Sequence, residues 1–253
     1  MCGAFVYVYL GGVRYQLMGS ALERAGIGGL IARKSYLGSR FNIRPTQYVV
    51  TIVSEYGRPV AKPMRWGLIP GWATSDKLPR STFNARDDRL AESGIWRGPF
   101  ARSRGVVPSN GFYEWNKVDG TKQPMFFSPK ADREELLLFA AIYDSWINEY
   151  GEKIDSCAIV TTDANEFMTT IHDRMPAILD EETVDLWLDP TTTKSENLQS
   201  ILMPASNDLL KAVPVSKRVN SFKNDDSGLI DEISIDEPAA EHRQLGLFGD
   251  QFE

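Results

Sequence analysis

The stretch RGVVPSNGFYEWNKVDGTKQPMFFS, residues 104–128, decides the fold class. Its segments 104–108, 111–115 and 124–128 are rich in β-branched and aromatic residues, which is typical of strands. A turn at Ser109-Asn110 separates the first two segments, and Asp119-Gly120 favours a hairpin turn before the third. The stretch therefore predicts successive strands that are joined by turns.

Apolar runs on both sides extend this pattern. Further predicted strands cover 4–10, 47–53, 60–66, 135–147, 156–162 and 212–219. Short predicted helices cover parts of 15–34, 84–92, 163–170, 181–188 and 194–203. Because the helices are inserted without a βαβ repeat, we expect an α+β fold. Its core should be a largely antiparallel β-sheet or barrel, with the short helices at the periphery.

Composition sets the boundaries of the chain. The 253 residues suffice for a folded domain over 1–224, followed by an acidic, Gly/Pro/Ser-containing tail over 225–253 that we expect to be disordered. The tail holds nine acids and one base, so residues 1–224 carry 27 bases against 25 acids, which is compatible with polyanion binding. No apolar run could span a membrane and no basic n-region marks a signal peptide, so we expect a cytoplasmic protein. We also expect a monomer that is associated with the nucleoid.

The first three residues, Met1-Cys2-Gly3, offer distinctive chemistry. If Met1 is removed, Cys2 carries an α-amine and a thiol on adjacent carbons. The amine can condense with an aldehyde and the thiol can close on the imine carbon, giving a five-membered thiazolidine. Alternatively, the amine can serve as the base for its own thiol, as in N-terminal nucleophile hydrolases. A start codon followed by a strand is the simpler interpretation of position 2 alone.

Three polar clusters lie in apolar surroundings. They are Asn84-Ala85-Arg86, Glu114 between Tyr113 and Trp115, and His172-Asp173-Arg174. Glu114 is expected to point away from its aromatic neighbours, either into solvent or as a buried carboxylate that relays protons. His172 is either structural or functional on a rigid loop, and Arg86 is a surface charge or a phosphate ligand. Trp66, Trp72 and Trp115 fit either the core or base stacking.

Two cysteines, Cys2 and Cys157, and two histidines make a protein-only metal site improbable, so we expect no metal and no cofactor. Eight ordered motifs then identify a resemblance. They are MCG, FNIRPTQ (41–47), MRWGLIPGWA (64–73), FNARDD (83–88), GFYEW (111–115), IVTTDAN (159–165), IHDRMPAIL (171–179) and VPVSKRVN (213–220). Together they resemble the SRAP family, the SOS-response-associated proteins that process abasic sites in DNA.

The resemblance implies a compact α+β domain with a positively charged channel for single-stranded DNA. It implies that Cys2 traps the ring-opened abasic sugar as a thiazolidine, an abasic-site cross-linking and lyase-type activity. A peptidase activity that removes Met1 is also implied. The implied catalytic residues are Cys2, Asn84, Glu114 and His172, and the expected DNA contacts are Arg40, Arg44, Trp66, Trp72, Arg86 and Arg102. The family commonly has Arg at the position of Ala4, a contact that Arg40, Arg44 or Arg102 would have to replace.

The tail contains Gln244-Leu245-Gly246-Leu247-Phe248, which resembles the pentapeptide that docks bacterial proteins on the β sliding clamp. Gln244 would anchor through its amide, while Leu245, Leu247 and Phe248 would supply apolar contacts. Two other functions stay open from the sequence. One is an N-terminal-Cys hydrolase similar to class II glutamine amidotransferases, and the other is a non-catalytic sensor of single-stranded DNA.

Overall fold

Five strands close into a small barrel in the computed structural model, which describes residues 3–7, 38–78, 81–118, 120–130, 136–192 and 194–234. The barrel strands are β3 (Tyr48–Glu55), β4 (Arg58–Trp66), β6 (Arg104–Ser109), β9 (Leu137–Ile147) and β10 (Lys153–Asp163). The ring closes because β10 pairs with both β4 and β9. Three short strands extend its sheet: β5 (Asn84–Arg86), β11 (Arg174–Pro176) and β12 (Ile178–Leu179).

A second, five-stranded sheet has the order β13-β8-β7-β1-β2. Its strands are β1 (Ala4–Tyr7), β2 (Arg40–Ile43), β7 (Gly111–Val118), β8 (Thr121–Pro129) and β13 (Leu210–Pro214). The chain passes from the barrel into this sheet at Ser109-Asn110. Gly111 is required there, because a Cβ atom would lie 2.3 Å from the carbonyl oxygen of Phe127.

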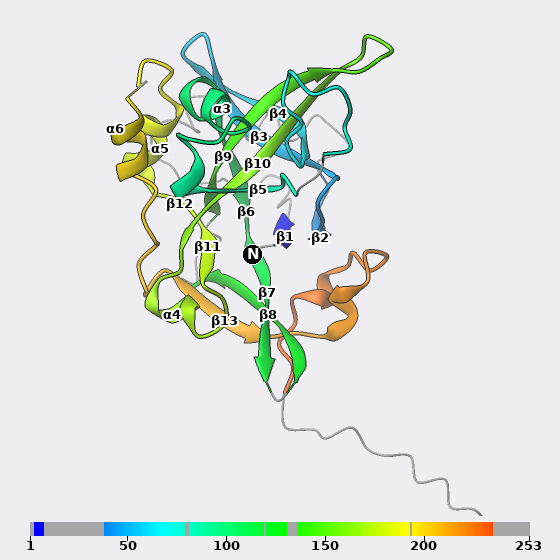
Figure 1. The fold of residues 1–253 in the computed structure, drawn as a ribbon. Helices are drawn as coiled ribbons and strands as arrows, with labels where there is room; N and C mark the ends of the chain where they lie inside the picture. Colours follow the sequence, from blue (N-terminus) through cyan, green and yellow to red (C-terminus); the bar gives the residue numbers. More distant parts are fainter. Residues whose placement is uncertain are drawn as a thin grey trace, which may run out of the picture.

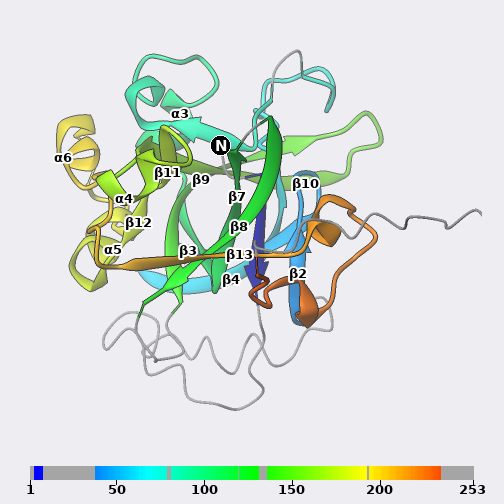
Figure 2. The same ribbon diagram turned by 90° about the horizontal axis from the view of Figure 1, so that it is seen from below.

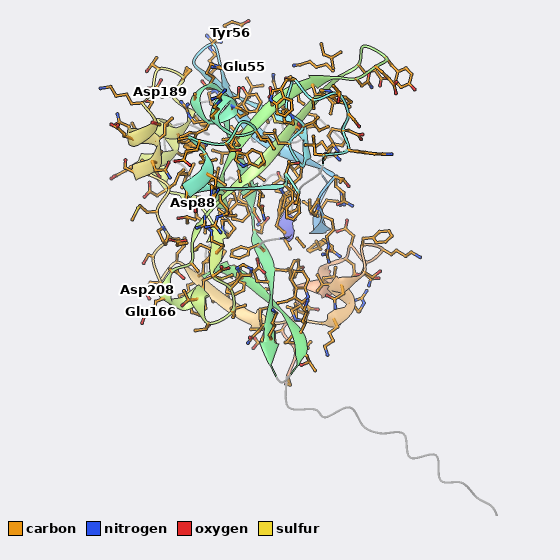
Figure 3. All side chains as sticks on the ribbon, viewed as in Figure 1. Glu55, Tyr56, Asp88, Glu166, Asp189 and Asp208 are labelled. Atoms are coloured by element: carbon orange, nitrogen blue, oxygen red, sulfur yellow. The ribbon has the colours of Figure 1, made fainter. Side chains whose placement is uncertain are left out.

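Short helices cover the outside. They are α3 (Arg97–Arg102), α4 (Glu166–Thr169), α5 (Glu181–Leu188) and α6 (Ser195–Ser200), with 3-10 turns at Asp87–Arg89, Lys217–Asn220 and Ser227–Leu229. The two views place α4, α5 and α6 on one flank of the barrel, opposite the segment that follows β13 (Figure 1, Figure 2). Figure 3 shows Glu166, Asp189 and Asp208 on the same flank as these helices, away from hairpin β7–β8. The predicted α+β class with a largely antiparallel barrel and short peripheral helices is therefore confirmed.

Side-chain alternation along β7 separates two apolar clusters. Phe112 belongs to the barrel core with Phe5 and Trp66, whereas Tyr113 and Trp115 belong to a smaller cluster under the 3-10 turns. Among the described segments, the helix predicted over 84–92 is wrong. Residues 84–86 pair as a strand with β10, and only Asp87–Arg89 turn helically. The predictions over 8–37 lie outside the described residues.

The folded body extends beyond residue 224, so the predicted boundary is too early. Asp225 pairs with Arg40 and accepts the backbone N–H groups of Phe41 and Asn42. Leu229 is fully buried, and Glu232 forms a β-bridge with Val215. Residues 1–234 hold 27 bases against 29 acids, so the folded body is not basic overall, and the expected contacts with a polyanion would require local positive charge.

Candidate active site

Glu114 is the buried acid of the site. Only 3% of its surface is exposed, so the solvent-facing alternative does not hold. Burial raises the pKa of the Glu114 carboxyl above its ordinary value, and the interaction with His172 acts in the opposite direction. A carboxyl with a raised pKa keeps its proton closer to neutral pH. Glu114 is therefore suited to give and take protons.

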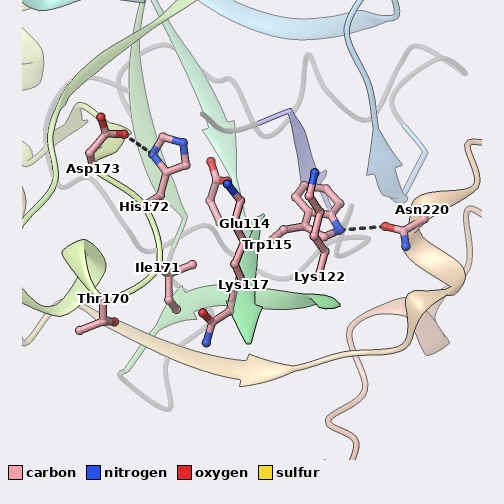
Figure 4. Close-up of a pocket in the computed structure, with 10 residues that line it drawn as sticks. Glu114, Trp115, Lys117, Lys122, Thr170, Ile171, His172, Asp173 and Asn220 are labelled. Atoms are coloured by element: carbon pink, nitrogen blue, oxygen red, sulfur yellow. Dashed lines mark hydrogen bonds and ion pairs between the residues drawn. The ribbon is translucent and has the colours of Figure 1, made fainter. Parts of the chain in front are cut away.

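A pocket of about 700 Å³ opens beside Glu114. It lies between hairpin β7–β8, the loop that precedes β11, and the 3-10 turn at Lys217–Asn220 (Figure 4). Its lining residues are Glu114, Trp115, Asn116, Lys117, Lys122, Thr170, Ile171, His172, Asp173 and Asn220. The pocket combines two carboxyl groups, an imidazole, two amides and two ammonium groups, which makes it a polar site beside a rigid sheet.

His172 faces the pocket from the loop between α4 and β11 (Figure 4). Its Nδ1 atom lies 2.8 Å from a carboxylate oxygen of Asp173 and 3.0 Å from the backbone nitrogen of Arg174. The Arg174 N–H donates to the neutral imidazole, whereas the protonated ring donates to Asp173. Both states thus have a partner, so His172 can change protonation without losing its orientation.

The first strand, β1, begins beside Glu114. Ala4 pairs with Tyr113 and Phe5 with Phe112 in antiparallel register, so Gly3, one position earlier, lies level with Glu114. Cys2 itself lies outside the described residues. The other cysteine, Cys157, is fully buried on β10, and burial raises the pKa of its thiol to about 12. Cys157 is therefore a core residue and not a nucleophile.

Strand β5 brings Asn84 and Arg86 to the end of β10, where Ile159 pairs with Asn84 and Thr161 with Arg86. Asn84 is half-buried and is not part of the pocket lining. Arg86 is exposed and forms two hydrogen bonds with Asp88, which raise the pKa of the guanidinium. The more remote carboxylates of Asp163 and Asp173 raise this pKa further.

Arg174 connects these elements, although the sequence motifs gave it no role. Its guanidinium is 4% exposed and pairs with Asp87 after β5, with Asp163 at the end of β10, and with the carbonyl oxygen of Thr161. The loop that carries His172 is thereby fixed to the strand that carries Asn84.

Replacing Arg174 with Met is expected to lower the free energy of unfolding by about 3 kcal/mol, because Asp87 loses its buried partner. The matched control is Arg86→Met, which breaks an exposed pair with Asp88 and should cost under about 1 kcal/mol. Urea unfolding at neutral pH measures both. Equal losses in the two variants would show that Arg174 does not hold these elements together.

The predicted stacking role of Trp66 is wrong. Its ring is fully buried, packs edge-on against Phe5 and Phe83, and donates its indole N–H to the carbonyl of Phe83. Trp72 is 68% exposed and shares a separate pocket of about 250 Å³ with Arg97 and Arg102. Trp72 and Arg102 therefore lie together, but they do not line the pocket of Glu114.

Arg40 begins β2 and Arg44 follows its last residue, and both side chains form hydrogen bonds within the protein. Arg40 pairs with Asp225 and hydrogen-bonds Gln47, while Arg44 bonds Asn42 and the carbonyl of Val219. The Arg44 guanidinium also lies 5.6 Å from the centroid of the Trp115 ring. The pairing of Phe5 with Ile43 makes Ala4 and Arg44 the next positions along the two strands. Of the three predicted replacements for an arginine at position 4, the register puts Arg44 beside it.

In the part of the chain that the structure describes, no helix is long and apolar enough to cross a membrane. Within the same residues, no three His, Cys, Asp or Glu side chains are grouped as metal ligands. The clamp-like residues Gln244, Leu245, Leu247 and Phe248 lie outside the described residues.

Fold and site define a β-barrel protein whose N-terminal strand begins beside a pocket with a buried carboxylic acid and a histidine. The chain belongs to the SRAP family, described as SOS response associated peptidase, whose profile matches residues 1–222. It is 35% identical to the Bacillus subtilis abasic site processing protein YoaM over 91% of this chain and 98% of that protein. It is 36% identical to the abasic site processing protein YoqW of the same organism, over 91% of this chain and 99% of that protein.

A vertebrate protein and a solved bacterial structure are also similar to this chain. The chicken abasic site processing protein HMCES is 38% identical over 64% of this chain and 54% of that protein. The crystal structure of a protein from Bacteroides thetaiotaomicron superposes with a TM-score of 0.73, at 28% identity, over 85% of this chain and 96% of that one. The fold is therefore shared with a solved bacterial structure.

Proposed function

We propose that this protein binds single-stranded DNA and traps abasic sites covalently through Cys2, which shields the lesion. The observation that carries the proposal is the register of β1 on β7, which brings Gly3, the residue after Cys2, level with Glu114. Glu114 shares its pocket with His172. The relatives named as abasic site processing proteins support the same substrate.

The chemistry balances without a cofactor. Once Met1 is removed, by the protein itself or by another peptidase, the Cys2 amine attacks the aldehyde carbon of the opened sugar. Water leaves and an imine forms. The thiol sulfur then adds to the imine carbon while the nitrogen takes up the thiol proton, which closes the thiazolidine. Glu114 supplies and accepts protons during ring opening and water loss, and His172 moves protons at the sugar during β-elimination or release.

The DNA path requires positive and aromatic groups around the pocket. We assign Arg86 and Arg44 to phosphates near the abasic sugar, since Arg86 shares β5 with Asn84 and Arg44 lies 5.6 Å from the centroid of the Trp115 ring. Trp72 and Arg102 would contact the strand farther away, by stacking and by charge. Docking of the tail on a sliding clamp through Gln244–Phe248 remains a prediction.

The aldehyde requirement tests the proposal directly. Processed protein is incubated with three single strands of one sequence, carrying an abasic site, a tetrahydrofuran analogue that cannot open, or a normal base. A band that survives denaturation is expected only with the true abasic site. Intact mass verifies that Met1 is absent. An equal band with the tetrahydrofuran strand would overturn the thiazolidine mechanism.

A further inference from the structure

Two lysines face each other at the mouth of the active-site pocket. Lys117 on β7 and Lys122 on β8 are directly opposite in the hairpin register, and both line the pocket that contains Glu114 and His172 (Figure 4). Like charges directly opposite on paired strands destabilise a sheet. A bound anion would offset the repulsion between these two ammonium groups beside the active site.

In the long hairpins of the barrel, by contrast, lysine side chains are paired with acids. On β3–β4 the ammonium group of Lys62 pairs with Glu55, and on β9–β10 that of Lys153 pairs with Asp155. In the described part of the chain, neither Lys117 nor Lys122 has an ion pair with a carboxylate. Of the acids that line this pocket, Glu114 is buried and Asp173 pairs with His172. The lysine pair is thus charged and available to an external anion.

The pocket lining joins a buried acid to exposed ammonium groups. Glu114 is buried, whereas Lys117 and Lys122 are exposed. Lys117 follows Glu114 by three residues along β7, about 10 Å for an extended strand, so its side chain leaves the strand on the opposite face from Glu114 and on the same face as Trp115. The amide side chains of Asn116 and Asn220 line the space around them. A neutral sugar suits the buried acid, and an anionic group attached to it suits the exposed ammonium groups.

We propose that Lys117 and Lys122 form a phosphodiester clamp that holds the DNA strand next to the abasic nucleotide. This inference rests on the proposed function, because the phosphodiester is that of the strand being processed. Lysine suits the role as a mobile point charge that accepts any sequence. The bound phosphate would relieve the repulsion between the two ammonium groups, so hairpin stability and strand binding are linked.

The rival explanation is that the lysines only protect a strand edge from aggregation, a common use of lysine. The two explanations differ in their salt dependence. Each phosphate that a protein neutralises on a single strand contributes about 0.7 to the slope of log affinity against log salt. A clamp therefore predicts a smaller slope when the charges are removed, and edge protection predicts no change.

The experiment measures anisotropy of an intact, base-containing single strand across a salt series. The double variant Lys117→Gln/Lys122→Gln is expected to lose about 0.7 from the slope if the lysines share one phosphate and about 1.4 if each holds one. The control is Lys211→Gln, an exposed lysine on β13 of the same sheet that does not line the pocket. It should keep the wild-type slope.

A charge reversal separates binding from folding. Lys122→Glu places an acid opposite Lys117, so its thermal midpoint should equal or exceed that of the wild type while strand binding weakens. Unchanged slope and affinity in both variants would overturn the clamp. Because the strand is intact, this result is independent of the adduct. If the variants keep the wild-type salt slope and affinity and the adduct forms normally, only the clamp is overturned. If the wild type forms no adduct, the proposed function is overturned.

Discussion

Cys2→Ala protein is expected to form no denaturation-resistant adduct with abasic single-stranded DNA, while its binding to an intact strand is unchanged. Alanine keeps the α-amine, so the imine still forms, but no thiol is present to close the ring. An open imine hydrolyses when the complex is denatured. The loss should therefore be complete on a denaturing gel, which is the largest effect that we predict.

Borohydride separates the two halves of the reaction. It reduces an imine to a stable amine, so the Cys2→Ala variant should show an adduct only when the reductant is present. Cys157→Ala is the matched control, because Cys157 lies in the barrel core and its thiol is buried. That variant should give the wild-type yield. A stable Cys2→Ala adduct of full yield without borohydride would disprove the role of the thiol.

Much of the fold could be predicted from the sequence, because its strands are marked by strong local signals. The β-branched runs of β3, β9 and β10 and the Asp119-Gly120 turn each predict their structure from neighbouring residues alone. The pairing partners of the strands could not be predicted in this way, because closure of the barrel depends on β10 contacting both β4 and β9. No local pattern encodes that contact.

The site was predicted in part. The alternation along β7 correctly separated Glu114 from Tyr113 and Trp115, but burial of Glu114 could not be inferred because it depends on the packing around β7. For Trp66 the prediction of an exposed stacking residue was wrong. A Trp near Gly and Pro suggests a surface loop, but its ring lies in the core. Arg174 was missed because Asp87, its mostly buried partner, lies 87 residues away in the sequence.

The tail boundary was misplaced for a similar reason. Acidic composition predicts disorder when the charges have no partners. Asp225 and Asp226 pair with Arg40 and Arg218, and Leu229 is buried beneath them. Amino-acid composition does not reveal these ion pairs, because Arg40, the partner of Asp225, lies 185 residues away in the sequence.

Glu114→Gln is expected to slow adduct formation by roughly 10²-fold, the usual contribution of a positioned acid or base, with less effect on the final yield. Gln keeps the shape and hydrogen-bonding groups of Glu but cannot give or accept the proton that ring opening and water loss require. Quenched time courses on denaturing gels measure the rate. His172→Ala is the comparison, and it should chiefly change strand cleavage or adduct release. Indistinguishable time courses for the wild type and both variants would remove these assignments.

The same substitution should stabilise the fold. Burial raises the pKa of Glu114, so the folded protein holds this proton more tightly than the unfolded chain does. The wild type therefore has its full stability below the ordinary carboxyl pKa and loses stability as the pH rises toward the folded-state pKa. Glutamine is neutral at every pH and avoids this loss. The variant should accordingly exceed the wild type in unfolding free energy at pH 7, and the difference should shrink as the pH falls.

Together the two measurements distinguish a catalytic carboxyl from a structural one. A buried Glu that only supports the fold would make Glu114→Gln less stable or neutral, with a normal rate of adduct formation. A Glu kept for proton transfer makes the variant slower and more stable, because its burial costs stability and serves the reaction. Urea unfolding at pH 5 and pH 7, beside the time courses, gives both quantities on the same protein. A variant that is slow but also destabilised at pH 7 would contradict the assignment of Glu114 as a proton donor held by burial.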